Sequence, residues 1–196
     1  METVFVRSTP AGTLATARPN WDNEGFTMTC AVSYPRTSPQ QPQAPLRDTI
    51  DDQFGLRPQS FLITAGTLSL SLDAENRLVA IDFYTNASDW RASALEPVEA
   101  SQSVLRFSAP FDVLGRASEA READVFYDAR TGTICLSWGT ADDWHLLAAN
   151  LSIGLATDGR LMQVRVDGLS VPEQDRTLSQ GAAGWLGVAQ RLFGKR

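Results

Sequence analysis

The stretch TLSLSLDAENRLVAIDFY (residues 67–84) decides the fold, because a second copy, NLSIGLATDGRLMQVRVD, follows at residues 150–167. The two copies align without gaps, so that Leu68 matches Leu151 and Ile81 matches Val164. In each copy, apolar residues alternate with polar ones on both sides of a polar centre, which indicates two strands with one buried face. Glu75-Asn76 and Asp158-Gly159 stand at the turn, and Asn and Gly accept the positive φ of a tight hairpin. Each copy is therefore predicted to be a β-hairpin, and both to descend from one duplicated unit.

Further strands are predicted before each hairpin. Val125–Gly139 reads as two strands around the turn Asp128–Gly132, and Gly25–Pro35 is the expected counterpart in the first copy. Ser103–Gly115 adds one or two strands with a break at Pro110, because proline lacks the N–H that a strand ladder requires.

Helical patterning is scarce. Leu46–Gly55 is a candidate short helix, and Ser118–Ala123 a candidate single helical turn. Thr37–Pro45 is rich in proline and glutamine, so we expect a surface loop there.

These patterns predict a mainly β protein, α+β at most. We expect an antiparallel sandwich or rolled sheet made of two duplicated β-meanders, with a C-terminal amphipathic helix. Residues 1–98 form the expected first repeat, with an N-terminal strand and a Pro/Gln-rich loop at 36–60. Residues 99–172 form the second repeat, and residues 173–196 a linker and the C-terminal helix. Whether the two repeats share one core stays open at this point.

The second repeat resembles a small bacterial family of uncharacterised β-meander domains. Members of that family read roughly Tyr-Asp-x-x-x-Asp-x-Leu-Tyr-Ile, then a strand and Asp-x-x-Gly-x-Leu. The resemblance departs from the family at Thr133 and in the insert ADDWHLLAA. It implies an antiparallel β-meander and no particular activity. The matching positions are Tyr127, Asp128, Ile134, Leu136, Asp158, Gly159, Arg160, Leu161 and Val164.

Length and composition narrow the class of protein. A chain of 196 residues with 43% hydrophobic and 20% charged residues forms one domain or two small ones. Its net charge of −6 argues against nucleic-acid binding, which relies on neutralising phosphates. It contains no run of the ~20 apolar residues that a membrane-spanning helix needs. Cys30 and Cys135 are expected to be buried free thiols, and the protein to be cytoplasmic, or peripheral to a membrane complex.

The single histidine is the main candidate catalytic residue. His145 stands beside Asp142 and Asp143, and a histidine near carboxylates can act as a general base. The alternative is that the two acids form a polar turn and His145 begins a strand.

Other catalytic or metal patterns fail on spacing. Ser152 lacks the glycine that opens a Gly-x-Ser-x-Gly nucleophile turn. Neither Asp51-Asp52 nor Asp142-Asp143 has the alternate spacing of a calcium loop. We therefore expect no catalytic residue, no metal site and no cofactor.

Five tryptophans are many for this length, and two interpretations stay open. They can line a cavity for an apolar or aromatic ligand. They can also fill the ends of a small core, where each ring buries ~150–250 Å². The tryptophans are Trp21, Trp90, Trp138, Trp144 and Trp185.

The C-terminal segment GWLGVAQRLFGKR (residues 184–196) differs in charge from the rest of the chain. The last acid is Asp175, so residues 176–196 carry a net charge of +4. On a helical projection, apolar residues gather on one side of this segment and basic ones on the other. The surface that it covers is the protein's own sheet, a partner protein or an anionic membrane. The candidate partner-binding residues are Trp185, Leu186, Val188, Leu192, Phe193, Arg191, Lys195 and Arg196.

Three functions follow, in order of preference. The first is a non-catalytic accessory or interaction subunit that docks on a protein partner or lies peripheral to a membrane-bound complex. The second is a small-ligand-binding β domain with a Trp-lined cavity. The third is an enzyme that uses His145. Open sheet edges would also allow a homo-oligomer.

Overall fold

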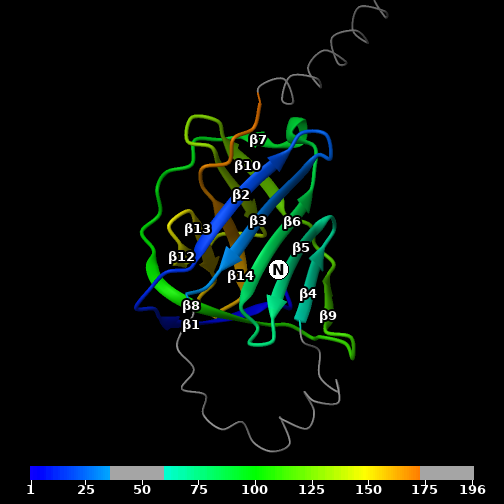
Figure 1. Cartoon of the computed structure of the whole chain (residues 1–196), viewed down its shortest axis with the longest axis vertical. Coiled ribbons are helices and arrows are strands. Elements are labelled where there is room, and N and C mark those ends of the chain that lie inside the picture. The colour runs from blue at the N-terminus through cyan, green and yellow to red at the C-terminus, as the bar shows by residue number, and fades with distance from the viewer. Residues whose placement is uncertain (36–59, 173–196) are drawn as a thin grey trace, which may run out of the picture.

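Two β-sheets that share one hydrophobic core make up the described part of the chain (Figure 1). The computed structural model describes residues 1–35 and 60–172. The structure is 55% strand and 2% helical, which confirms the predicted mainly β class. The C-terminal amphipathic helix and the short helix at Leu46–Gly55 were predicted outside the described residues. Among the residues that are described, no helix has the length and apolar character to cross a bilayer.

The first sheet has six strands within the described ranges. In spatial order they are β2 (Thr16–Asp22), β3 (Thr27–Ser33), β6 (Leu78–Tyr84), β5 (Leu68–Asp73), β4 (Ser60–Ala65) and β9 (Arg116–Glu119).

The second sheet has eight strands in the same part of the chain. In spatial order they are β1 (Phe5–Pro10), β8 (Ser101–Ser108), β12 (Asp143–Ala148), β13 (Leu151–Leu155), β14 (Leu161–Val166), β11 (Thr133–Ser137), β10 (Asp124–Asp128) and β7 (Arg91–Ala92). A short 3-10 helix, η1 (Ala87–Asp89), precedes β7.

Both sheets are mixed, whereas we predicted antiparallel ones. Among the described strands, the parallel pairs are β4 with β9, β8 with β12, and β7 with β10. The other described strand pairs are antiparallel, as hairpins and meanders require. The parallel pairs arise where a strand joins the edge of a meander after a long connection.

Each sheet contains five strands in the same order. The order is β2-β3-β6-β5-β4 in the first sheet and β10-β11-β14-β13-β12 in the second. We call β2–β6 the first unit and β10–β14 the second unit. The repetition therefore extends beyond the hairpin that the sequence reveals, to a complete five-stranded unit.

The repeated hairpin is β5–β6 in the first unit and β13–β14 in the second. Each carries a bulge at the equivalent position, before the pairs Leu72↔Leu78 and Leu155↔Leu161. At the turn, Asn76 and Gly159 both have positive φ, at 61° and 84°. The predicted hairpins and turn residues are thereby confirmed.

The strands before these hairpins repeat as well, but at a larger sequence offset. β2–β3 turns at Asp22 and β10–β11 at Asp128, and each carboxylate accepts a hydrogen bond from the backbone N–H two residues later. The offset is larger because the chain between Ser33 and Ser60 is far longer than the chain between Ser137 and Asp143. Most of that insertion is the Pro/Gln-rich segment, which lies outside the described residues.

Edge strands cross between the units. β1 and β7 lie in the sheet of the second unit, and β9 lies in the sheet of the first (Figure 1). β9 also corrects the helical turn predicted at Ser118–Ala123. Ala117 and Glu119 are buried while Arg116 and Ser118 are exposed, which is the period of a strand.

The buried side chains of both units form a single hydrophobic cluster. Leu70 of the first unit and Ile153 of the second occupy equivalent positions, and both are fully buried. Trp138, after β11, is 1% exposed in the same cluster. Because the two units share one core, each provides the apolar surface that the other covers.

Candidate functional site

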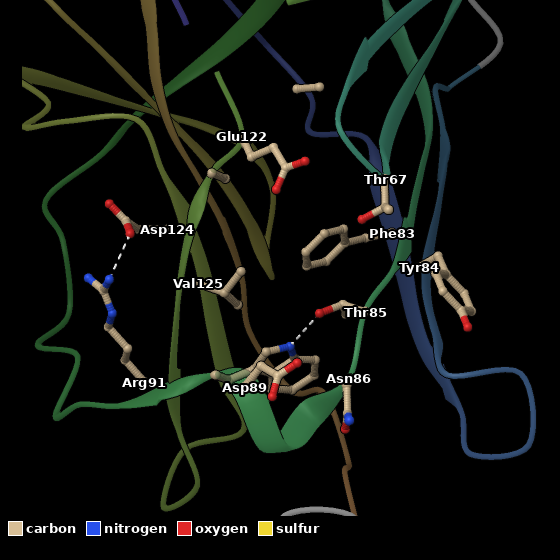
Figure 2. Close-up of a pocket in the computed structure, with 13 residues that line it drawn as sticks. Thr67, Phe83, Tyr84, Thr85, Asn86, Asp89, Arg91, Glu122, Asp124 and Val125 are labelled. Carbon is tan, nitrogen blue, oxygen red and sulfur yellow. Dashed lines mark hydrogen bonds and ion pairs between the residues drawn. The ribbon is translucent and has the colours of Figure 1, made fainter. Parts of the chain in front are cut away.

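A pocket of about 460 Å³ lies between the two units. One wall comes from the β4–β5 turn, the end of β6 and η1, and the other from the segment that leads into β10 (Figure 2). We call it the seam pocket. Its lining residues are Ala65, Thr67, Phe83, Tyr84, Thr85, Asn86, Asp89, Trp90, Arg91, Glu122, Ala123, Asp124 and Val125.

The apolar part of the seam pocket is held by Trp90. Its indole N–H donates a hydrogen bond to Thr85 Oγ1 at 2.9 Å. Its ring packs edge-on against Trp21, with ring centroids 5.1 Å apart, and against Tyr127 at 5.3 Å. Trp90 is 8% exposed, so these contacts fix its position. Figure 2 shows Val125 from the opposite wall directed toward Phe83.

Local structure explains why Trp90 lies there. Asn86 caps η1 by accepting a hydrogen bond from the Ser88 N–H at 3.1 Å. η1 ends at once in extended backbone at Trp90. The chain then leaves the first unit and pairs with β10 through β7.

Glu122 supplies a carboxylate to the polar rim. Its side chain lies over Gly66 of the β4–β5 turn, where an added Cβ would come within 2.5 Å of Glu122 Oε1. Gly66 also has a φ of +59°, a region that favours glycine. Within residues 1–35 and 60–172, the Glu122 carboxylate has no hydrogen-bond or ion-pair partner. Figure 2 shows it opposite the Thr67 side chain.

The arginine at the pocket is already paired. Arg91 forms an ion pair with Asp124 Oδ1 at 3.1 Å and lies over the Phe126 ring. In Figure 2 this pair lies on the far side of β10 from Thr67 and Phe83. Asp124 and Val125 are neighbours on a strand, so their side chains point to opposite faces.

The equivalent seam at the other end of the repeat is closed. In the alignment of the two hairpins, Ala65 and Thr67 correspond to Ala148 and Asn150. Ala148 forms a parallel bridge with Ala15, whose N–H donates to Leu147 O at 3.0 Å. Asn150 Nδ2 donates to Ala17 O at 3.3 Å. The fold therefore does not by itself require a pocket at this junction.

The tryptophans that were predicted to line one cavity lie in different parts of the structure. Trp90 lines the seam pocket and Trp21 packs against it, as the cavity interpretation expects. Trp138 is buried in the core and donates to Arg121 O at 2.9 Å. Trp144 lies against Gly154 on the second sheet. Trp185 falls outside the described residues.

His145 does not gain the acid partner that the sequence suggested. Its Nδ1 lies 3.2 Å from Ser101 Oγ and 3.1 Å from Ser103 Oγ. The Asp142 carboxylate instead accepts hydrogen bonds from the N–H and hydroxyl of Thr157. Burial lowers the pKa of His145, and the charge of Asp143 opposes this shift. His145 lies within β12, near its start, as the alternative interpretation expected, but the strand begins at Asp143, which was expected in the turn.

The structure also places the candidate metal ligands and the two cysteines. No group of three or more His, Cys, Asp or Glu side chains in the described part of the chain could hold a metal ion. Cys30 and Cys135 are buried free thiols, as predicted, and burial raises the pKa of each to about 11. Asp51 and Asp52 lie outside the described residues.

The predicted partner-binding residues of the C-terminal segment lie outside the described residues as well, so their role stays a prediction. Sequence reasoning missed Glu122, Asp89 and Thr67. In the sequence, these residues look like ordinary surface residues of loops and turns. They come together only because two segments that are far apart in the sequence meet in the fold.

No protein-family model matches the chain, and no curated protein matches it in sequence. The resemblance of the second repeat to bacterial β-meander domains therefore stays a prediction.

Proposed function

We propose that this protein is a non-catalytic small-ligand-binding β domain, with the seam pocket as its binding site. The observation that carries this proposal is a cavity of about 460 Å³ between the two units. Ligand sites are typically clefts of roughly 300–1,000 Å³ with an apolar lining and a few polar groups. The seam pocket lies in that size range and combines apolar side chains, Trp90, Phe83 and Val125, with polar ones that include Thr67 and Glu122.

The closed seam supports this proposal. The two units meet at two equivalent junctions: one is bridged by backbone and Asn150 hydrogen bonds, and the other lines a pocket. We further propose that the fold is a β-sandwich that arose by duplication of one five-stranded unit.

Filling the pocket tests the proposal. Thr67 is an exposed turn residue, so Thr67→Phe places a ring in the cavity without disturbing a strand. Ligands found by isothermal titration calorimetry or by a change in tryptophan fluorescence should lose binding in this variant. Thr9→Phe, on the exposed strand β1, is the matched control and should bind normally. Unchanged binding in Thr67→Phe would contradict the proposal.

A second function is favoured by the charge distribution of the sequence. Residues 176–196 carry a net charge of +4, while the chain before them carries −10, which together give the total of −6. We propose that this segment docks the domain on a protein partner or beside a membrane-bound complex, as an accessory subunit. Deleting residues 177–196 should abolish co-purification with the partner and leave the melting temperature unchanged. Retained co-purification would overturn the docking function.

A further inference from the structure

The carboxylates of the seam pocket outnumber its free cationic groups. Among the described residues, its lining includes the acids Asp89, Glu122 and Asp124 and one cation, Arg91, which pairs with Asp124 at 3.1 Å. The interior wall is formed by uncharged side chains, which are Thr67, Phe83, Thr85, Trp90 and Val125. A ligand that enters this space therefore meets net negative charge.

The Glu122 side chain lies over Gly66 at the edge of the pocket. Gly66 has no side chain, and the Glu122 carboxylate occupies the space where a Cβ would lie. In the described residues this carboxylate has no cationic partner, and it faces the uncharged side chain of Thr67 (Figure 2). An occupant that displaces water from a carboxylate must replace that hydration with donors or positive charge. An anion or a purely apolar molecule supplies neither.

The apolar wall adds a requirement for the body of the ligand. Trp90 and Phe83 line the cavity with the small part of their rings that is exposed. Val125 is directed toward Phe83 from the opposite side (Figure 2). Aromatic rings attract cations through their quadrupole as well as apolar groups through burial. A strongly hydrated metal ion would leave this surface unused, whereas an organic cation uses both features.

We infer that the seam pocket binds a small organic cation, an ammonium group on a short apolar body. This inference rests on the proposed function and names its ligand class. The ammonium lies between Glu122 and Thr67, and the apolar body lies against Trp90, Phe83 and Val125. The ammonium belongs to a free amine or to a lysine side chain, which share this chemistry.

The test compares ligands of equal shape and different charge. Phenethylammonium, 2-phenylethanol and phenylacetate are titrated into the full chain by isothermal titration calorimetry at low salt. The cation should bind about tenfold more tightly than the alcohol, and the anion most weakly, because a charged hydrogen bond is roughly twice as strong as a neutral one. A tripeptide, N-acetyl-Gly-Lys-Gly-amide, tests whether a lysine side chain supplies the ammonium.

Glu122→Gln should reduce affinity for phenethylammonium about tenfold and leave affinity for 2-phenylethanol unchanged. Glu99→Gln removes an exposed carboxylate that does not line the pocket, and should leave both affinities unchanged. Circular dichroism and melting temperature show that each variant is folded.

The possible failures are distinct. Equal binding of the alcohol and the ammonium, lost in Thr67→Phe, would overturn the charge preference and keep the pocket as a ligand site. Tightest binding of phenylacetate would overturn it in favour of Arg91. If none of the four molecules binds, both the ligand class and the proposed function are wrong.

Discussion

The two seams join equivalent parts of the two units but differ in structure. At the closed seam, Ala15 pairs with Ala148, and Asn150 reaches the backbone of Ala17. At the open seam, the equivalents of Ala148 and Asn150 are Ala65 and Thr67, which line a cavity instead. Thr67 is shorter than Asn150 and has no amide to donate across the gap.

This comparison shows how little separates a sealed junction from a pocket. Strand order, bulge position and turn hydrogen bonds are shared by both units. The differences lie in the turn after β4 and in the path of the chain after β6. Two units of the same strand order can therefore be sealed at one junction and line a pocket at the other.

The largest expected effect tests whether the two units are equivalent and share one core. Leu70→Ala and Ile153→Ala should each lower the free energy of unfolding by about 2–5 kcal/mol, because each leaves a buried cavity. Urea unfolding followed by circular dichroism measures the loss, and both variants should unfold in a single transition. Two separate transitions would show that the units are independent, and the comparison of their seams would lose its basis.

A smaller effect tests the packing of Glu122 at the open seam. Gly66→Ala should destabilise the fold by about 1–2 kcal/mol, because a left-handed backbone disfavours a Cβ. Part of that destabilisation comes from the contact between the new Cβ and Glu122. In a double-mutant cycle, Gly66→Ala should therefore cost less free energy when Glu122→Ala is also present.

Gly12→Ala is the control for this cycle. Gly12 has no heavy atom near its added Cβ, so the variant should lie within about 0.5 kcal/mol of the parent. A Gly66→Ala loss that does not change when Glu122 is removed would contradict the contact.

Breaking the closed seam should lower the free energy of unfolding by about 1 kcal/mol. Asn150→Ala removes the hydrogen bond to Ala17 O, and a typical bond of this kind contributes about 0.5–1.5 kcal/mol. Thr67→Ala, at the equivalent open position, should change stability by less than about 0.5 kcal/mol. Chemical denaturation of both variants measures the difference. Equal losses would mean that both seams contribute alike.

The smallest effect concerns pH. His145 occupies the position of Leu62 in the first unit, and burial lowers its pKa in the folded state. The unfolded chain therefore binds the proton more readily, and stability should fall as the pH drops below about 6.5, the ordinary value for histidine. His145→Gln should flatten the stability profile between about pH 5 and 7, measured by thermal unfolding. A steeper profile would contradict the assigned direction.

Local sequence signals predicted the parts of the fold that depend on near neighbours. The alternation in residues 67–84 and 150–167 and the positive-φ positions Asn76 and Gly159 were sufficient for both hairpins. The predicted counterpart of Val125–Gly139 in the first copy, Gly25–Pro35, contains β3 but not β2. β2 was not predicted because an insertion changes the offset and few side chains are shared.

The seam pocket could not be predicted from such signals. Glu122 and Gly66 are far apart in the sequence and meet only because β9 joins the first sheet. The segment 118–123 was predicted to be a helical turn because its residues favour helices, yet its start, Ser118–Glu119, is the end of β9 and pairs with β4. β9, which crosses to the first sheet, therefore explains both why the predicted helical turn was wrong and where the candidate site lies.

The crossing of β9 and β7 also bears on the history of the gene. β9 is encoded after the first unit and completes its sheet, whereas β7 is encoded before the second unit and borders its sheet. A break in the gene between the halves would give two products, each carrying a strand that the other requires. If the units arose by duplication, as proposed above, the copies could diverge in sequence after these connections formed but could no longer be inherited apart.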